Sequence, residues 1–302
     1  MRIDPTGGAP LLDVVIVSFR SRDLLRACLN SLERHPPAAG PMRVHVVDNA
    51  SADGTAEMVR AEFPAVALHA LPANTGFSAA NNVVLRDSRA PYVLVLNPDT
   101  EVTPGALDHM LSLMEREPDV GMAGCRLVQP DGTFDHAAKR SFPTPLSALA
   151  HFTGVGRRAG AAGRLADYRA PDLPDTGAGD VDAVNGAFML VRRRAMDEVG
   201  LLDEGYWLYM EDLDWCYRFH QKGWRIRYDG AASVLHVKGG SSGAYRRARQ
   251  NIAFHQGMGR FYRKFYAGKN PLADGTVYLG IAGKLALSLA RSAVMRTLRA
   301  PD

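Results

Sequence analysis

Over its first 130 residues the chain alternates short, nearly continuous apolar runs with amphipathic segments. Each run has the length and composition of a strand that is buried on both faces of a sheet. The runs are residues 11–19, 44–47, 66–71 and 92–96. Between them, apolar side chains recur at helical spacing, as from Leu24 to Leu32. This alternation predicts βαβ units, and therefore an α/β fold with a mainly parallel sheet flanked by helices.

Residues that favour helix starts follow the first two runs. We expect Ser21 or Asp23 to cap the first helix, and Ser51 or Asp53 to cap the second. Further elements are predicted along the rest of the chain. They are helices at 79–87 and 106–115, a strand through 190–191 with a short helix after it, a helix starting near 211, a strand at 232–237, and helices at 245–266 and 277–299.

The stretch 129–180 lacks this periodicity and is rich in Gly, Ala, Pro and Arg. We interpret it as a long insertion over the site, where a second substrate is gripped. Its GVGRRAG segment at 154–160 has the wrong spacing for a dinucleotide-binding loop and follows no convincing strand.

The C-terminal part is strongly basic. Residues 240–302 hold eleven Lys or Arg against two Asp, a net charge of +9. Lys284 and Arg291 interrupt the apolar run of the last helix, so it does not offer the roughly 20 uncharged residues of a spanning helix. It reads as a basic amphipathic helix on an anionic membrane surface, or else as a packing helix with exposed charges. Nucleic acid is not expected as a partner, because no recognition motif accompanies the basic residues.

Composition narrows the class of protein further. The chain has 302 residues and is 46% hydrophobic, which is enough for a real core. Its three cysteines form no CxxC pair, which argues against a disulfide framework or a zinc knuckle. The first ten residues lack the apolar core of a signal peptide, so we expect a cytoplasmic protein.

Polar residues collect where the predicted strands end. These clusters are residues 19–21, 48–49, 74–82 and 97–99. Ligands of parallel α/β sheets bind beyond the carboxyl ends of the strands, so the clusters predict a site, although each alone fits ordinary turn chemistry. The site has neither GxGxxG nor GxxxxGK[ST]. Phosphates held without a glycine cradle are usually held through a metal ion, and Asp99 is the obvious oxygen ligand.

Three carboxylates stand at the start of a predicted helix, after an aromatic run. On a helix Glu211 and Asp214 share a face, while Asp212 points about 100° away. One carboxylate could therefore act as a general base in a cleft while the others anchor the turn. The alternative is that acidic residues simply favour a helix N-terminus through the macrodipole. His236, just before a glycine-rich turn, is either a metal ligand or a structural residue.

Taken together, a series of motifs in order from about residue 11 to 242 resembles one enzyme family. The motifs are VVIVSFRS, VVDNASADGT, NTGFSAANN, LNPDT, VNGAFMLVRR, MEDLDWCYR and LHVKGGSS. They resemble the inverting nucleotide-sugar glycosyltransferases of family 2, which have a GT-A fold. Within this family the chain is most similar to bacterial rhamnosyltransferases that act on lipid-linked cell-wall or polysaccharide precursors. The resemblance implies a GT-A domain at 1–243, with the insertion near the acceptor site, and a basic helical region at 244–302.

The resemblance also implies roles for individual residues. The residues that would hold the base and ribose of the donor are Ser18, Phe19, Arg20 and Asp48. The residues that would shape the wall around ribose and diphosphate are Asn74, Gly76, Phe77 and Asn81. Asp99 matches the metal-binding carboxylate of the DxD element, whose first position here is Asn97, and His236 matches a further metal ligand. Asp212, paired with Glu211, matches the catalytic base. From position alone, Gly186 would leave room for the sugar, and Trp207 would stack on sugar or acceptor.

These expectations define a reaction and its partners. We expect the enzyme to transfer a sugar to a hydroxyl of a glycan or lipid-linked saccharide. The first choice of donor is dTDP-L-rhamnose, which supplies L-rhamnose, and the second is a UDP-sugar. The expected cofactor is Mg²⁺ or Mn²⁺, and the expected location is the inner face of the plasma membrane. A non-catalytic nucleotide-sugar-binding homologue is the alternative. We do not favour a nucleotidyltransferase, because that class would show a glycine-rich basic loop after the first strand. We do not favour a glycosidase, because that class needs two carboxylates that face each other. The sequence leaves homo-oligomerisation open.

Overall fold

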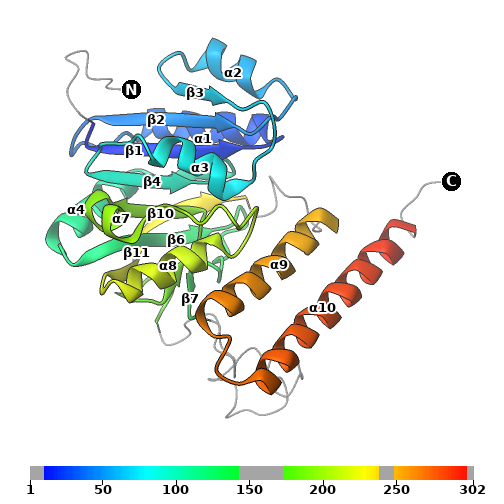
Figure 1. Cartoon of the computed structure of the whole chain (residues 1–302). Helices are drawn as coiled ribbons and strands as arrows, with labels where there is room; N and C mark the ends of the chain where they lie inside the picture. The colour runs from blue at the N-terminus through cyan, green and yellow to red at the C-terminus, as the bar shows by residue number, and fades with distance from the viewer. Residues whose placement is uncertain (1–9, 143–172, 238–247, 298–302) are drawn as a thin grey trace.

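A computed structural model describes residues 10–142, 173–237 and 248–297 (Figure 1). Within these residues a central sheet of nine strands runs in the order β3-β2-β1-β4-β10-β6-β11-β5, and β8 pairs with β11. The strands are β1 Leu12–Ser18, β2 Met42–Asp48, β3 Ala67–Ala70, β4 Tyr92–Leu96, β5 Thr100–Val102, β6 Val120–Val128, β8 Ala178–Asp180, β10 Phe188–Arg192 and β11 Arg225–His236. Helices flank this sheet, as the alternating pattern predicts.

The first half of the sheet is built from parallel βαβ units. β1 is the central strand of this half and pairs in parallel with β2 on one side and β4 on the other. Every residue of β1 is buried, which explains its unbroken apolar run. The connecting helices are α1 Arg22–Arg34, α2 Thr55–Glu62 and α3 Phe77–Leu85.

The second half of the sheet is mixed. β10 runs antiparallel between β4 and β6, and β11 is parallel to β6 but antiparallel to β5 and β8. The α/β fold is confirmed, but the parallel character predicted from the first 130 residues is confined to that part. Helices α4 Ala106–Arg116, α7 Arg193–Val199 and α8 Glu211–Gln221 complete this half.

The helix caps differ from the sequence expectation. Ser21 occupies the N-cap position of α1, but its hydroxyl lies 2.9 Å from Ser18 Oγ and makes no capping bond. The residue at the start of α2 is Gly54, in the left-handed conformation. Asp53 instead accepts hydrogen bonds from the backbone and hydroxyl of Thr55, at 3.1 and 2.5 Å. Turn chemistry around a glycine therefore replaces the predicted side-chain cap.

The ends of the predicted 129–180 insertion are part of the folded sheets. Lys139–Arg140 forms β7, which pairs with β9 Ala183–Val184, while β8 joins β11. The expectation that regular structure pauses until residue 180 is wrong, because strands of two or three residues are too short for a period-two pattern to be visible. The central part of the insertion, 143–172, lies outside the described residues.

Two helices end the described chain, α9 Ala248–Phe265 and α10 Pro271–Thr297 (Figure 1). Phe261 of α9 is buried in the same apolar core as the sheet. α10 packs along α9, with Val277 and Ile281 against Tyr262. By length and composition alone the stretch Pro271–Ala290 could cross a membrane, with a mean hydropathy of 1.2 and 11% of it buried. The sequence argument that excluded this on charge is therefore too strict.

The predicted division of the chain at residue 243 stays a prediction.

Candidate active site

The carboxyl ends of β1 and β2 are tied together by short polar bonds. Asn49 N donates to the Ser18 carbonyl at 2.8 Å. Ser51 N donates to Asp48 Oδ1 at 3.2 Å, and Ser51 Oγ accepts from Arg20 N at 3.0 Å. Ser18 and Asp48, predicted from sequence to serve the donor, thus lie side by side at one edge of the sheet.

The backbone around these residues is held in an uncommon conformation. Arg20, Ala50 and Ala52 all have positive φ angles, of 54°, 61° and 51°. Such non-glycine residues persist where surrounding bonds fix them, and they concentrate at functional sites. Arg20 stays exposed, with its guanidinium 5.2 Å from the centroid of the Phe19 ring. A cavity of about 360 Å³, lined by Arg20–Leu24 and Asp53, opens beside this loop.

Asn49 joins this edge to the loop before α3. Its side chain accepts a bond from Thr75 N at 2.9 Å and donates to the Gly76 carbonyl at 3.0 Å. Asn74 Oδ1 in turn accepts from Gly76 N at 3.0 Å. The loop that the sequence assigned to the ribose and diphosphate is thus clamped onto the end of β2.

Gly76 also contacts the chain segment that leads into α8. Its φ is +89°, and a Cβ there would overlap the carbonyl oxygen of Trp207. That same carbonyl accepts the Phe77 N–H at 2.7 Å. The close approach explains why glycine stands here. Asn81, one turn later, is fully buried, and its side-chain NH₂ donates to the Phe77 carbonyl at 2.9 Å. Its predicted place in the donor wall stays a prediction.

The end of β11 brings His236 between two carboxylates. His236 Nδ1 lies 3.2 Å from Asp135 Oδ2, and Nε2 lies 3.6 Å from Asp99 Oδ1. All three side chains are buried. Burial alone would lower the pKa of His236, but Asp135 and Asp99 outweigh it and raise the pKa to about 9. The structure brings together the two predicted metal ligands, and it adds Asp135, which the sequence did not single out.

The donor set around His236 fits a divalent cation. Carboxylate oxygen suits Mg²⁺ and Mn²⁺, imidazole nitrogen suits first-row transition metals, and a ligating His usually holds a carboxylate at its other ring nitrogen. Asp135 occupies that second position on the Nδ1 side. Within residues 10–142, 173–237 and 248–297, no three or more His, Cys, Asp or Glu side chains are grouped so that they could hold a metal by themselves. Substrate phosphates would therefore complete the coordination, as in many Mg²⁺ sites.

Asn97 connects the loop that carries Asp99 to the segment beside Asp212. Its backbone N–H donates to the Ala187 carbonyl at 3.1 Å, and its carbonyl accepts the Thr100 hydroxyl at 2.7 Å. The neighbour of Ala187, Gly186, donates its N–H to Asp212 Oδ2 at 3.3 Å. Main-chain bonds thus place the LNPDT loop beside residues 186–187, of which Gly186 contacts the predicted base, Asp212.

Asp212 and Asp214, at the start of α8, point to different sides, as helix geometry predicts. Asp214 turns inward, fully buried, and binds Arg218 at 2.7 Å and Lys264 at 2.6 Å. Asp212 turns to the other side and binds Arg140. The helix starts directly after two non-glycine residues with positive φ, Tyr209 at 71° and Met210 at 73°. This strained turn sets the direction in which the first carboxylates point.

Asp212 is held from several sides. Arg140 Nη2 lies 2.5 Å from Asp212 Oδ2 and also donates to the Val184 carbonyl at 2.6 Å. The second oxygen, Oδ1, accepts the Leu213 N–H at 2.8 Å. A Cβ on Gly186 would meet Asp212 Cβ at 3.7 Å, an ordinary contact, so the glycine is not needed for steric reasons against this side chain.

Glu211 sits beside Asp212 at the start of α8 and is buried. Burial, and next the charge of Asp212, raise the pKa of Glu211 to about 8. Its Oε2 is buried and has no hydrogen-bond partner among the described residues. Two adjacent carboxyl groups cannot both ionise easily in a buried place, so one negative charge is favoured on the pair.

Trp207 lies at the rim of the site with one face covered. The guanidinium carbon of Arg249, at the start of α9, stands 4.0 Å from a Trp207 ring centroid. A cation over an indole face at this distance is a favourable cation–π contact. Stacking of a sugar on Trp207 stays a prediction, and on the face that Arg249 covers it requires displacement of that side chain.

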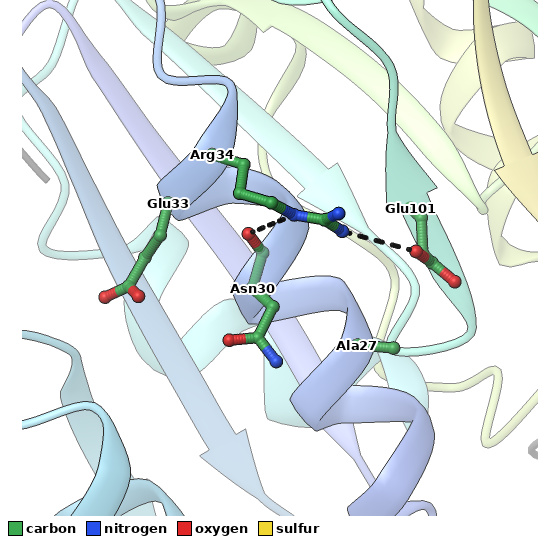
Figure 2. A pocket seen from close by; sticks show the side chains of 5 residues that line it. All are labelled: Ala27, Asn30, Glu33, Arg34 and Glu101. Carbon is green, nitrogen blue, oxygen red and sulfur yellow. Dashed lines mark hydrogen bonds and ion pairs between the residues drawn. The ribbon is translucent and has the colours of Figure 1, made fainter.

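A second cavity lies away from these residues. Figure 2 shows its lining on the second half of α1, with Glu101 of β5 opposite. It measures about 550 Å³, and Arg34 spans it toward Glu101, with 3.7 Å between Arg34 Nη2 and Glu101 Oε2. None of its lining residues is a predicted site residue. The remaining lining residues are Ala27, Asn30 and Glu33.

Sequence reasoning missed Asp135, Arg140 and Arg249. Asp135 and Arg140 lie in the aperiodic 129–180 stretch, and their partners are 101 and 72 residues away in the chain. Arg249 was counted only as one charge in a basic region. No local spacing links these residues to the site, so the three-dimensional fold was needed to find them.

The fold of this chain is shared with a known class of enzyme. The fold matches solved GT-A glycosyltransferases. One is a mannosyltransferase from Pyrobaculum calidifontis in complex with GDP-Man and Mn²⁺, with a TM-score of 0.57, 17% identity, and coverage of 95% of this chain and 76% of that one. GalNAc-T7 with UDP, GalNAc and Mn²⁺ gives 0.60 at 12% identity, covering 86% of this chain and 49% of that one. At these identities the likeness shows the fold.

Sequence comparison gives the family. Residues 13–200 match Glycosyl transferase family 2, and the chain belongs to this family. It is 31% identical to N-acetylglucosaminyl-diphospho-decaprenol L-rhamnosyltransferase of Mycobacterium tuberculosis over 256 residues, 81% of each chain. It is 25% identical to rhamnosyltransferase WbbL of Escherichia coli K12 over 169 residues, 53% of this chain and 60% of that one. The protein is therefore a glycosyltransferase, as its motifs indicate.

Proposed function

We propose that this glycosyltransferase moves L-rhamnose from dTDP-L-rhamnose, with inversion, onto a hydroxyl of a lipid-linked saccharide. The similarity to the mycobacterial L-rhamnosyltransferase supports this choice of donor and acceptor. The observation that carries the reaction type is the position of Asp212, which Arg140 and Gly186 hold beside the LNPDT loop.

Asp212 acts as the general base. A sugar hydroxyl becomes a competent nucleophile when a carboxylate accepts its proton during attack. A carboxylate has about four lone-pair positions, and the described contacts of Asp212 are one N–H on Oδ1 and two donors on Oδ2. A position therefore stays available for the acceptor hydroxyl. Attack opposite the leaving group inverts the anomeric centre without a covalent intermediate.

Asp99 and His236 hold the divalent cation, Mg²⁺ or Mn²⁺, in this proposal. When bound, the cation supplies positive charge for the departing nucleoside diphosphate. Asp135 holds the His236 ring in place through Nδ1. The donor nucleotide lies along the Ser18, Asp48 edge, and the loop at Asn74 and Gly76 closes its other side.

The C-terminal helix places the enzyme at a membrane surface in this proposal. Leu272, Leu279 and Leu287 are exposed by 85%, 76% and 52%. Their spacings of seven and eight residues put them on one face of α10. An apolar face on a basic region binds anionic lipid, where a lipid-linked acceptor resides. Flotation with vesicles containing phosphatidylglycerol checks this: Leu272→Glu/Leu279→Glu should stay with the soluble fraction, and unchanged flotation contradicts it.

The donor is tested by a binding screen. Thermal shifts are measured with dTDP-L-rhamnose, UDP-GlcNAc, UDP-galactose and GDP-mannose, each with and without Mn²⁺ or Mg²⁺. The proposal predicts a metal-dependent rise in melting temperature with dTDP-L-rhamnose that Asp99→Ala abolishes. Glu101→Ala, two residues along the chain, is the matched control and should keep the shift. A larger shift with another donor would overturn the rhamnosyl assignment.

A further inference from the structure

Arg140 is the only described cation whose side chain contacts the predicted base, and it comes from a separate element. It reaches α8 from β7, which is anchored by pairing Lys139 and Arg140 with Val184 and Ala183 of β9. Its side chain is 9% exposed and that of Asp212 is 11% exposed, so solvent screens their attraction poorly. One nitrogen, Nη2, makes both the bond to Asp212 and the bond to the Val184 carbonyl.

The surroundings of Asp212 in the described structure are otherwise acidic. Glu211 and Asp214 stand on the same helix, as does the buried thiol of Cys216. Asp214 is neutralised by its own partners, Arg218 and Lys264. Glu211 forms no ion pair among the described residues and its Oε2 has no hydrogen-bond partner there, while the nearby charge of Arg140 only partly offsets the rise in its pKa. Of the two neighbouring carboxyl groups, Asp212 is therefore the one that a described cation, Arg140, contacts.

Resting on the proposed function, we infer that Arg140 is a positioning residue which assigns the single negative charge of this pair to Asp212 and leaves Glu211 as the neutral acid. Arg140 stabilises the ionised form of the residue it touches, and the ionised neighbour then disfavours ionisation of Glu211. The same contact fixes the orientation of the carboxylate, because Nη2 is itself anchored to the β9 backbone. Arg140 thus acts through Asp212.

The charge of Arg140 determines in which direction its removal shifts the pH dependence of transfer. Removing the cation favours the protonated, inactive form of the base, so the acid limb of the kcat/KM profile for transfer moves to higher pH. The loss of rate is then greater at pH 6 than at pH 8. Lysine keeps the charge and can replace a contact made through one nitrogen, so Arg140→Lys should recover part of the shift.

The test compares pH profiles of sugar transfer in Arg140→Gln and Arg140→Lys. We expect the acid limb of Arg140→Gln to move up by one pH unit or more, with kcat at pH 7 reduced 10- to 100-fold and the KM for donor changed less than threefold. Arg140→Lys should show less than half of this shift. The matched control is Arg192→Gln, which removes another partly buried Arg that binds the carbonyls of Met114, Glu117 and Val120. It should lower the melting temperature and leave the profile in place.

An unshifted profile in Arg140→Gln, or an equal shift in both Arg140 variants, overturns the inference. Should Arg140→Gln not fold, Glu211→Gln gives an independent test: replacing a neutral acid by a neutral amide leaves the acid limb within half a pH unit, and a shift of one unit downward would show that Glu211 carries charge. Failure of the proposed function is distinguishable, because the wild type would then show no rhamnose transfer, or Asp212→Asn would retain it, whatever the Arg140 variants do.

Discussion

Lys264 Nζ of α9 lies 2.6 Å from Asp214 Oδ1 of α8, and 2.8 Å from Asp203 Oδ2. Asp214 is fully buried and also binds Arg218. A cation of α9 therefore binds α8, the helix that carries the predicted base, close to its N-terminus.

Loss of this cation should destabilise the protein. Lys264→Met leaves Asp214 with Arg218 as its remaining described cation and removes one partner of Asp203. Breaking a buried ion pair on one side costs about 3–5 kcal/mol, and because the Lys264 side chain is 33% exposed we expect a loss of about 1–3 kcal/mol of unfolding free energy. Chemical denaturation measures it, with the exposed Lys269→Met as control. A loss below about 0.5 kcal/mol would show that the bridge is not formed in solution.

Gly76 should be intolerant of any side chain. Its positive φ and the overlap with the Trp207 carbonyl both oppose a Cβ, so Gly76→Ala should cost about 3 kcal/mol or more and weaken donor binding. Gly105 is the matched control. Its φ is +74° with nothing within 4 Å of a Cβ, so Gly105→Ala should cost about 1 kcal/mol and leave donor binding intact. Equal effects of the two substitutions would refute the close contact.

Asp13 should make stability depend on pH. Burial opposes its ionisation, but hydrogen bonds from His45, Arg43 and Ser88 outweigh this and lower the pKa of Asp13 to about 2. The folded pKa is below the unfolded one, so the stabilisation is complete above about pH 5 and declines as pH falls toward 2. The cost of Asp13→Asn should thus shrink by about 1 kcal/mol between pH 6 and pH 3.

Urea unfolding at a series of pH values measures this difference. The exposed Asp197, paired with Arg193 at i and i+4, provides the control Asp197→Asn, which should change stability by about 0.5 kcal/mol or less at each pH. A pH-independent cost for Asp13→Asn would mean that its carboxylate is not selectively stabilised in the folded state.

Asp135 should tune cation affinity without being one of the two predicted ligands. Asp135→Asn keeps the side-chain shape but removes the charge beside His236 Nδ1. Substitution of a carboxylate that holds the other ring nitrogen of a metal-binding His lowers metal affinity about 10- to 100-fold. Calorimetric titration of Mn²⁺ in the presence of dTDP tests it, with the exposed Asp131→Asn as control. Unchanged affinity would remove Asp135 from the metal site.

Sequence patterning was sufficient for the parallel half of the fold, since β1 and β4 are buried on both faces and read as unbroken apolar runs. It also placed Asp212 and Asp214 of α8 on different faces, because helix geometry alone decides that. The antiparallel β10 could not be oriented from sequence, since strand direction leaves no mark on an apolar run. Arg140 was beyond reach for another reason: its partner is defined by the pairing of two-residue strands, which no periodic pattern announces.

The role of Asp212 is tested most directly by transfer of labelled rhamnose from dTDP-L-rhamnose to an N-acetylglucosaminyl-diphospho-lipid by Asp212→Asn. The control Asp229→Asn alters another buried carboxylate, one paired with His109 at 2.9 Å. We expect Asp212→Asn to lower kcat by about 10²–10⁴ while the donor Kd from calorimetry stays within about threefold, and Asp229→Asn to keep transfer per folded molecule. Transfer by Asp212→Asn within about tenfold of the wild-type rate would contradict the assignment of the base.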